Sequence, residues 1–271
     1  MKRKNYISIL LLILSLSVFA NAQYSRLSVT GMGHLQLQSG DSRASEGSGY
    51  GGVVQFNYDI GKRFRLNFAV GSDMMNLTQS DVLDEWQWDY WEDTYIDFLP
   101  GATVEIVNQT LRYDSNDSLF SARFSPDQNL KELTLGVGAD YSMSLSGKFS
   151  GVIGVQLGIS KFKRELRMEE HWIKRFDLDS TVAGLDYEYE YDLLHFAPSK
   201  QGSKIFAAPQ FGLNYQLSNS LALTAAGQYL VYFDRGSVEW LENLFGISDD
   251  GERWFPLKNK LRVGVGLTFS Y

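Results

Sequence analysis

The residues best suited to binding chemistry gather in one stretch, DEWQWDYWEDTYIDF, which covers residues 84–98. Flat aromatic rings can dock a sugar or a protein surface, and carboxylates between them can bind Ca²⁺ or a basic partner. The candidate binding residues are Asp84, Glu85, Trp86, Trp88, Asp89, Trp91, Glu92 and Asp93. The alternative is a hairpin whose rings pack on neighbouring loops while its acids face water.

Two further motifs carry oxygen ligands. YDSNDS, residues 113–118, spaces them closely but lacks the fixed glycine and the distal glutamate of a calcium loop, so a turn is favoured over a metal site. YEYEYD, residues 187–192, alternates tyrosine and acid with period two. This pattern suits an exposed ribbon that extends the sixth strand better than it suits a catalytic pair.

Catalysis has few candidates, since the chain holds only three histidines, His34, His171 and His195. His195 lies near Ser199, but a nucleophilic serine needs a base positioned against it, and no motif around these residues provides that arrangement. The sequence therefore predicts no catalytic residue, no metal site and no cofactor. We expect a protein that is not an enzyme.

The elements that position these residues are β-strands. The segment LRVGVGLTFSY alternates strictly, with apolar residues at odd positions from Leu261 to Tyr271 and with Arg262, glycine, threonine and serine at even positions. Seven earlier segments show the same alternation over about ten residues each. They are RLSVTGMGHLQLQ, VVQFNYDI, RFRLNFAVG, ELTLGVGADYSM, VIGVQLGIS, IFAAPQFGLNYQL and LALTAAGQYLVYF. The sequence thus predicts eight strands.

The connections between these strands alternate in length. Three are tight turns with hairpin chemistry, DIGK at 59–62, SLSGK at 144–148 and SNS at 218–220. The other four are long, at about residues 38–50, 74–131, 164–203 and 236–256. Short turns at one rim and long loops at the other are typical of an outer-membrane β-barrel, with the short turns in the periplasm and the long loops outside the cell.

The beginning of the chain predicts export. Lys2, Arg3 and Lys4 precede a short apolar run, and an A-x-A site follows before Gln23. We expect a signal peptide at residues 1–22 and one barrel domain at residues 23–271. The chain has no cysteine, so no disulfide framework is expected. Acidic residues outnumber basic ones, 32 to 25, and most of them fall in the long loops, which argues against nucleic acid as a partner.

A closed barrel explains the two faces of each strand. Every backbone group in hydrocarbon must find a partner in the protein, so the last strand is expected to pair with the first, near residues 26–38. The odd positions of the last strand should meet lipid, and the small residues should fill a narrow lumen. The charged lumen residues Asp59, Arg65, Asp140 and Arg262 are expected to form a paired polar network. A proton or ion path is the alternative.

The leader ending ANAQ, the eight alternating segments and a last strand with Phe269 and Tyr271 together resemble small outer-membrane β-barrels, the class of OmpA-type transmembrane domains and of OmpX-like and OmpW-like barrels. The resemblance implies an all-β, eight-stranded antiparallel transmembrane barrel. It also implies a monomer in the outer membrane of a Gram-negative bacterium, in contact with outer-membrane lipid and lipopolysaccharide. Phe269 and Tyr271 resemble the assembly signal that the barrel-assembly machinery reads. No segment resembles the peptidoglycan-binding domain of full-length OmpA-like proteins.

We therefore expect a non-enzymatic barrel whose acidic, aromatic-rich extracellular loops serve envelope structure or bind an external ligand or protein. One alternative is a facilitator of small hydrophobic molecules, in the manner of OmpW-like barrels. Another is a barrel enzyme that modifies lipid A, although the segment around His195 lacks the histidine–serine–asparagine pattern of the lipid A deacylases. An accessory role in assembly or secretion is a further possibility.

Overall fold

The computed structural model describes residues 27–38, 46–79, 82–97, 99–101, 103–114, 118–177, 186–234 and 253–271. The expected signal peptide lies outside the described residues, as do parts of the expected long loops. None of the described helices is long and apolar enough to cross a bilayer.

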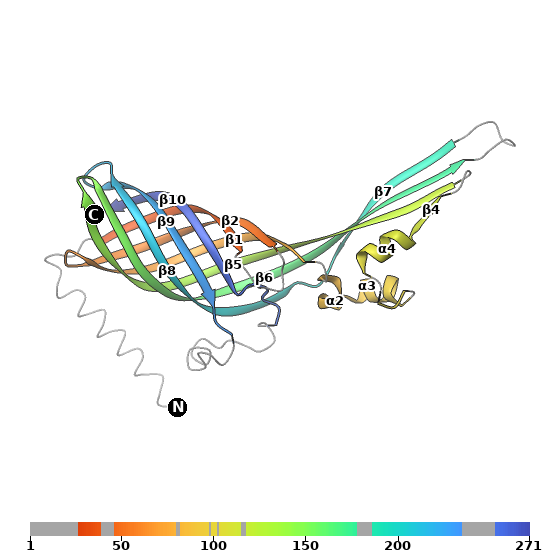
Figure 1. The fold of residues 1–271 in the computed structure, drawn as a ribbon, viewed down its shortest axis with the longest axis horizontal. Helices are drawn as coiled ribbons and strands as arrows, with labels where there is room; N and C mark the ends of the chain where they lie inside the picture. The colour runs from red at the N-terminus through yellow and green to blue at the C-terminus, as the bar shows by residue number, and fades with distance from the viewer. Residues whose placement is uncertain are drawn as a thin grey trace, which may run out of the picture.

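Eight strands form one closed antiparallel ring (Figure 1). Around the ring the order is β5, β3, β2, β1, β10, β9, β8 and β6, and β6 pairs back with β5. The strands are β1 (Leu27–Gln38), β2 (Glu46–Ile60), β3 (Phe64–Thr78), β5 (Ser118–Ser146), β6 (Phe149–Asp177), β8 (Lys200–Gln216), β9 (Leu221–Tyr232) and β10 (Asn259–Ser270). The eight predicted strands are confirmed.

The first and last strands close the ring, as predicted. β1 pairs with β10 from Ser28 opposite Ser270 to Gln38 opposite Lys260. The backbone amide of Tyr271 adds one more bond, donated to the carbonyl of Leu27 at 2.9 Å. Closure leaves neither of these strands with an open edge, which is what a membrane-spanning sheet requires.

The two faces of β10 are also as predicted. Val263 and Val265 point outward and are more than half exposed, whereas Arg262 is buried in the lumen. Leucine, valine and phenylalanine side chains continue this exposed belt around the other strands of the ring. The predicted turns lie at one rim, where Gly61 and Gly147 adopt positive φ of 71° and 48°, a conformation that favours glycine.

The expected long loops 74–131 and 164–203 are wrong in extent, because much of their sequence is strand. β5 and β6 each run for 29 residues, and their outer halves leave the ring as a ribbon. β7 (Asp186–Phe196) joins this ribbon beside β6, and the short β4 (Arg112–Asp114) joins it beside β5 (Figure 1). Alternation continues through the ribbon, since buried Ala122 and Phe124 are interleaved with exposed Arg123 and Ser125. YEYEYD lies in β7, and three residues separate β7 from β8, the sixth predicted strand. It therefore extends that strand beyond the barrel, as expected.

The described part of residues 84–98 is helical, so the alternative of a hairpin is wrong. It contains most of α2 (Val82–Trp86), followed by α3 (Asp89–Trp91) and a π-helical turn η1 (Glu92–Ile96), and α4 (Val104–Thr110) comes next. The reason is spacing, because apolar pairs four residues apart, Val82 with Trp86 and Trp91 with Tyr95, lie on one helical face. These helices pack against one side of the ribbon (Figure 1).

Candidate functional site: lumen networks and an extracellular ribbon

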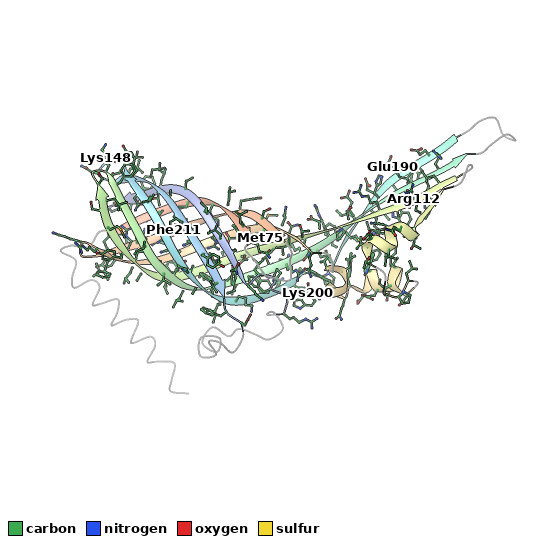
Figure 2. All side chains as sticks on the ribbon, in the orientation of Figure 1. Met75, Arg112, Lys148, Glu190, Lys200 and Phe211 are labelled. Atoms are coloured by element: carbon green, nitrogen blue, oxygen red, sulfur yellow. The ribbon has the colours of Figure 1, made fainter. Side chains whose placement is uncertain are left out.

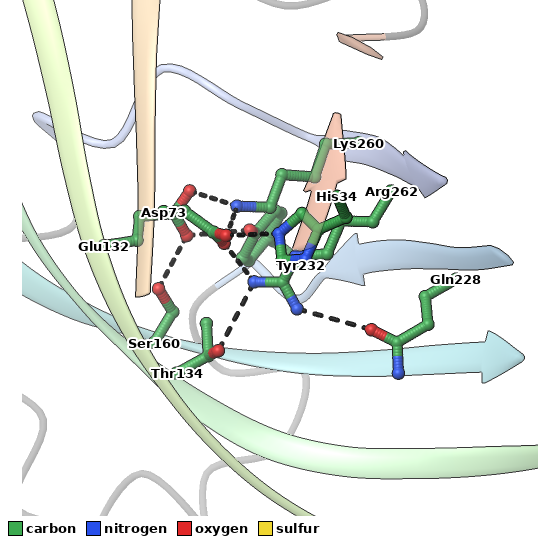
Figure 3. A network of polar contacts seen from close by, with 9 residues as sticks. All are labelled: His34, Asp73, Glu132, Thr134, Ser160, Gln228, Tyr232, Lys260 and Arg262. Carbon is green, nitrogen blue, oxygen red and sulfur yellow. Dashed lines mark hydrogen bonds and ion pairs between the residues drawn. The ribbon is translucent and has the colours of Figure 1, made fainter. Parts of the chain in front are cut away.

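A buried network of charges lies in the lumen (Figure 3). Lys260, at the start of β10, places it near the rim that carries the ribbon. The carboxylate of Asp73 lies 2.7 Å from Nε2 of His34 and 2.8 Å from Nζ of Lys260, and it also accepts a bond from Arg262. The carboxylate of Glu132 accepts a second bond from Lys260. Two carboxylates therefore pair with two basic side chains, so each of these buried groups has a partner of opposite kind.

The same network links six strands of the ring. His34 comes from β1, Asp73 from β3, Glu132 from β5 and Lys260 from β10. Glu132 further accepts bonds from Tyr232 of β9 at 2.8 Å and from Ser160 of β6 at 2.7 Å (Figure 3). These bonds cross the lumen and tie its walls together.

The four lumen charges expected from the sequence do not all pair directly with one another. Arg65 donates to Asp59 at 2.6 Å, in a pair that is partly exposed. Asp140 is buried and accepts bonds from Asn67 at 2.9 Å and from the side-chain amide of Gln210. Arg262 pairs with Asp73, and the side-chain amides of Gln228 and Gln210 link it to Asp140.

Sequence reasoning missed His34, Asp73, Glu132 and Lys260 as network members. Asp73 follows Ala69 and Gly71 on the lumen face, and Lys260 precedes Arg262 by one such step. Extending the period-two pattern by one residue pair at the ends of these strands would have placed them in the lumen.

One small cavity lies among polar side chains of the described lumen. The cavity beside Thr30, Gln55 and Gln210 measures about 40 Å³.

A second buried cation lies where the barrel meets the helices. Arg164 of β6 is fully buried and donates to Gln79 at 2.6 Å, to Gln128 at 2.6 Å and to Glu85 at 3.0 Å. Its guanidinium also lies 4.9 Å from the ring centroid of Trp86. Arg164 thus fastens α2 to the barrel mouth through a charge pair, two amides and one indole ring.

A buried carboxylate fastens the helices to the ribbon. Glu170 of β6 accepts bonds from the hydroxyls of Tyr90 at 2.6 Å and Tyr95 at 3.0 Å, and from Nε1 of Trp172 at 2.9 Å. His195 of β7 stacks on the ring of Tyr90 with centroids 4.1 Å apart. Burial, followed by the nearby charge of Glu170, raises the pKa of both tyrosine hydroxyls well above the usual value.

The expected surface-binding loop has buried rings. Trp86, Trp88 and Trp91 are 1%, 7% and 0% exposed, and they form a core with side chains of the ribbon such as Phe124 and Met168. The three indoles therefore pack as the alternative reading of this stretch had it, and they are not free to dock a ligand. Among the acids of the same set, Asp89 and Asp93 are exposed, Glu92 is half-buried, and Glu85 pairs with Arg164. The side chain of Asp84 lies outside the described residues.

A partly exposed aromatic face lies instead on the ribbon, beyond the helices. It consists of Phe120, Trp172, Tyr189 and Tyr191, with Lys174 among them, and we call it the aromatic face. Nζ of Lys174 lies 5.4 Å from the ring centroids of Phe120 and Tyr191 and 5.6 Å from that of Trp172. The indole of Trp172 and the ring of Tyr191 are nearly parallel, at 6°. The alternation of YEYEYD was the available signal for this face.

The opposite face of the ribbon is charged. Nδ1 of His171 lies 2.7 Å from Asp192, and its Nε2 lies 2.9 Å from Glu190. The bond to Asp192 raises the pKa of His171 above its usual value. Glu190 and Arg112 lie far along the ribbon, away from Lys148 at the short-turn rim (Figure 2).

The described residues contain neither a metal cluster nor a serine–histidine pair. No group of three or more histidine, aspartate or glutamate side chains within the described ranges could hold a metal ion. His195 contacts Tyr90 and Glu170, and the hydrogen bonds of the described part of the chain do not include one from His195 to Ser199. Phe269 and Tyr271, the expected assembly signal, lie on the outward surface and are exposed.

The closed ring of eight antiparallel strands, its exposed apolar belt and its filled polar lumen define an all-β transmembrane barrel of the small outer-membrane class, with short turns at the periplasmic rim and the long ribbon at the extracellular rim. No protein-family model matches the chain, and no curated protein matches its sequence.

Solved structures with a similar fold include Neisserial surface protein A, at 11% identity over 92% of this chain and 100% of that one, with a TM-score of 0.42. A major outer membrane protein from Thermus thermophilus matches at 11% identity over 92% and 100% of the two chains, with a TM-score of 0.43. Ail, the attachment invasion locus protein of Yersinia pestis, matches at 10% identity over 91% and 97%, with a TM-score of 0.36. At these identities the likeness concerns the fold alone.

Proposed function

We propose that this chain is a non-enzymatic protein of the bacterial outer membrane that uses its barrel as an anchor and its extracellular ribbon as a binding surface. The observation that carries the proposal is the uninterrupted passage of β5 and β6 from the barrel into the ribbon. Because both strands are continuous, the ribbon is held at a fixed position above the membrane, and exposed side chains on it can meet an external ligand without reordering a loop.

The filled lumen supports anchoring over transport. Arg164, Lys260 and Arg262 are buried across the lumen and its mouth, each held by carboxylates or amides. A facilitator of hydrophobic molecules would need an apolar passage, whereas the described lumen is lined by glutamine, asparagine, threonine and paired charges. This observation favours surface binding over the OmpW-like alternative.

The aromatic face supports a ligand with flat or saccharide surfaces. Tyr189 is 49% exposed, and its ring stands 5.1 Å from that of Tyr191. Adjacent rings of this kind stack on the apolar faces of sugars and on exposed protein side chains, and Lys174 adds one positive charge. We therefore assign ligand binding to the aromatic face of the ribbon and not to the tryptophans of residues 84–98.

The proposal is tested with the full chain folded in detergent micelles and applied to an array of immobilised saccharides and host-surface proteins. We expect binding that falls at least tenfold in Tyr189→Ser/Tyr191→Ser and is unchanged in Tyr50→Ser, an exposed tyrosine on the barrel wall. A planar bilayer holding the same protein should show no steady ion conductance. Steady conductance, or binding that survives the double substitution, would refute the proposal.

A further inference from the structure

The outward face of β5 and β6 changes from apolar to basic in one step at the extracellular end of the barrel. Along β5 in the direction of the ribbon, the exposed side chains Leu135 and Leu133 are followed by the exposed Lys131. On β6 Leu157 and Ile159 are followed by Lys161 and Lys163. The strand register sets Lys131 opposite Lys163, and Leu133 opposite Lys161. Three ammonium groups therefore gather directly above the apolar belt.

Only part of the positive charge of these lysines is neutralised by neighbouring residues. Like charges directly opposite each other on two strands repel, and Glu165 relieves this by accepting a bond of 2.6 Å from each of Lys131 and Lys163. Lys161 is exposed and makes no ion pair with any residue that the structure describes. Two positive charges thus remain in excess on a chain whose formal net charge is −7.

A hollow of about 360 Å³ adjoins the lysines on the side away from the apolar belt. Lys163, Arg167, Phe196 and Ser199 contribute to its lining. The ring of Phe196 is 68% exposed on the outward surface, opposite Arg167, which is itself held by Asp127 at 2.7 Å. The hollow therefore combines an exposed ring with hydrogen-bonding groups, a combination that suits a sugar.

We propose that Lys131, Lys161 and Lys163, with the adjoining hollow, bind the phosphate-bearing headgroup of a glycolipid in the outer leaflet. The three chemical zones of such a lipid match three zones of this surface. Acyl chains would lie along Leu133, Leu135 and Leu157, the phosphates would meet the ammonium groups, and the sugars would enter the hollow beside Phe196. A soluble phosphate would use only the middle zone, so a lipid is the ligand that fits the whole surface.

This inference rests on the orientation of the barrel, with the ribbon outside the cell, and not on what the aromatic face binds. The binding site lies on the barrel wall, and the aromatic face lies far along the ribbon. Tyr189→Ser should therefore leave lipid binding unchanged, so failure of one proposal can be told from failure of the other.

The experiment measures binding of purified phosphorylated lipid A to the full chain, folded in phosphate-free detergent micelles, by native mass spectrometry. Each basic residue near an anionic lipid surface strengthens binding, so Lys131→Gln/Lys161→Gln should raise the Kd by about 10- to 30-fold. The matched control is Lys62→Gln/Lys148→Gln, which removes the same charge from exposed positions at the opposite rim and should leave the Kd unchanged. All of these side chains are exposed, so each variant should keep its heat-modifiable gel mobility; should the double variant lose it, Lys161→Gln alone replaces it.

Two further probes separate the sources of phosphate. Dephosphorylated lipid A should bind the unaltered chain as weakly as phosphorylated lipid A binds the double variant. Inorganic phosphate in the low millimolar range should not displace the lipid. Equal affinity for both forms of lipid A, an equal loss in the control variant, or displacement by inorganic phosphate would each overturn the proposal.

Discussion

Glu170 makes several of the polar contacts that hold the helices against the ribbon. Its buried carboxylate accepts three bonds, from Tyr90, Tyr95 and Trp172, all of which come from aromatic side chains. Glu170→Leu would remove the acceptor of the buried Tyr95 hydroxyl and of the part-buried Trp172, and would leave Tyr90 only His195 as a partner. A buried donor left unsatisfied costs about 1–3 kcal/mol. We expect the segment from residue 82 to 110 to lose hydrogen-exchange protection while the barrel strands keep theirs.

The matched control is Glu169→Leu. Glu169 is the exposed neighbour on the other face of β6, so its substitution should leave exchange in residues 82–110 unchanged. Equal deprotection in the two variants would show that the effect is a general loss of charge rather than the loss of the acceptor.

The same cluster predicts a response to alkaline pH. Burial and Glu170 raise the pKa of Tyr90 and Tyr95, so both hydroxyls favour the protonated state in the docked helices. Their contribution to docking is present below about pH 10, where free tyrosine ionises, and is lost as the pH rises through the raised values. Phenolate absorbance should therefore show a late-titrating component that is missing in Tyr90→Phe/Tyr95→Phe. A titration curve identical in both proteins would contradict this assignment.

At the scale of elements, the helices are the cover of the ribbon. Phe124, Leu166 and Met168 point from β5 and β6 into the helical core and are almost fully buried. Replacing residues 82–110 by a glycine–serine linker should expose these side chains, while the closed ring keeps its own hydrogen bonds. We expect the variant to bind an apolar fluorescent dye and to be cleaved by protease within the ribbon, yet to retain heat-modifiable mobility. Gln109→Ala, on the exposed side of α4, serves as the control and should show neither change.

The elements differ in how far the sequence predicts them. The barrel strands and the pairing of β1 with β10 follow from alternation, because a slip of one residue would turn the aliphatic belt inward. The helical segment was missed because its acids and tryptophans were judged by composition, although Val82, Trp86, Trp91 and Tyr95 carry helical spacing. The outer halves of β5 and β6 were missed because they extend beyond the membrane. Without lipid against them, their faces mix aromatic and charged residues and show no apolar row.

The site residues were harder to predict than the strands. Alternation identifies which face of a strand points inward, but it does not say which inward residues meet across the ring. Asp73 and Lys260 are 187 positions apart in sequence, and they meet only because closure and strand stagger bring β3 and β10 to facing positions. Asp59, Arg65, Asp140 and Arg262 were each recognised as lumen charges, but their partners depend on that stagger.

At the scale of the whole molecule, Asp73 holds the ring closed from inside. It joins β3 to β1 through His34 and to β10 through Lys260 and Arg262, at a place where all four side chains are buried. Asp73→Asn keeps the shape of the side chain but leaves two buried cations facing one carboxylate, that of Glu132. Breaking a buried pair in this way costs about 3–5 kcal/mol. We therefore expect a lower midpoint for urea unfolding in lipid vesicles.

Asp59→Asn provides the comparison that isolates burial. Asp59 also pairs with an arginine, Arg65, but their side chains are 25% and 17% exposed and lie near the short-turn rim. A pair that water can reach contributes less than about 1 kcal/mol, so this variant should unfold close to the midpoint of the unaltered chain. If the two variants unfolded at the same urea midpoint, the network around Asp73 would contribute no special stability to the barrel. A large decrease in the midpoint of Asp73→Asn alone would show that this buried network stabilises the closed ring.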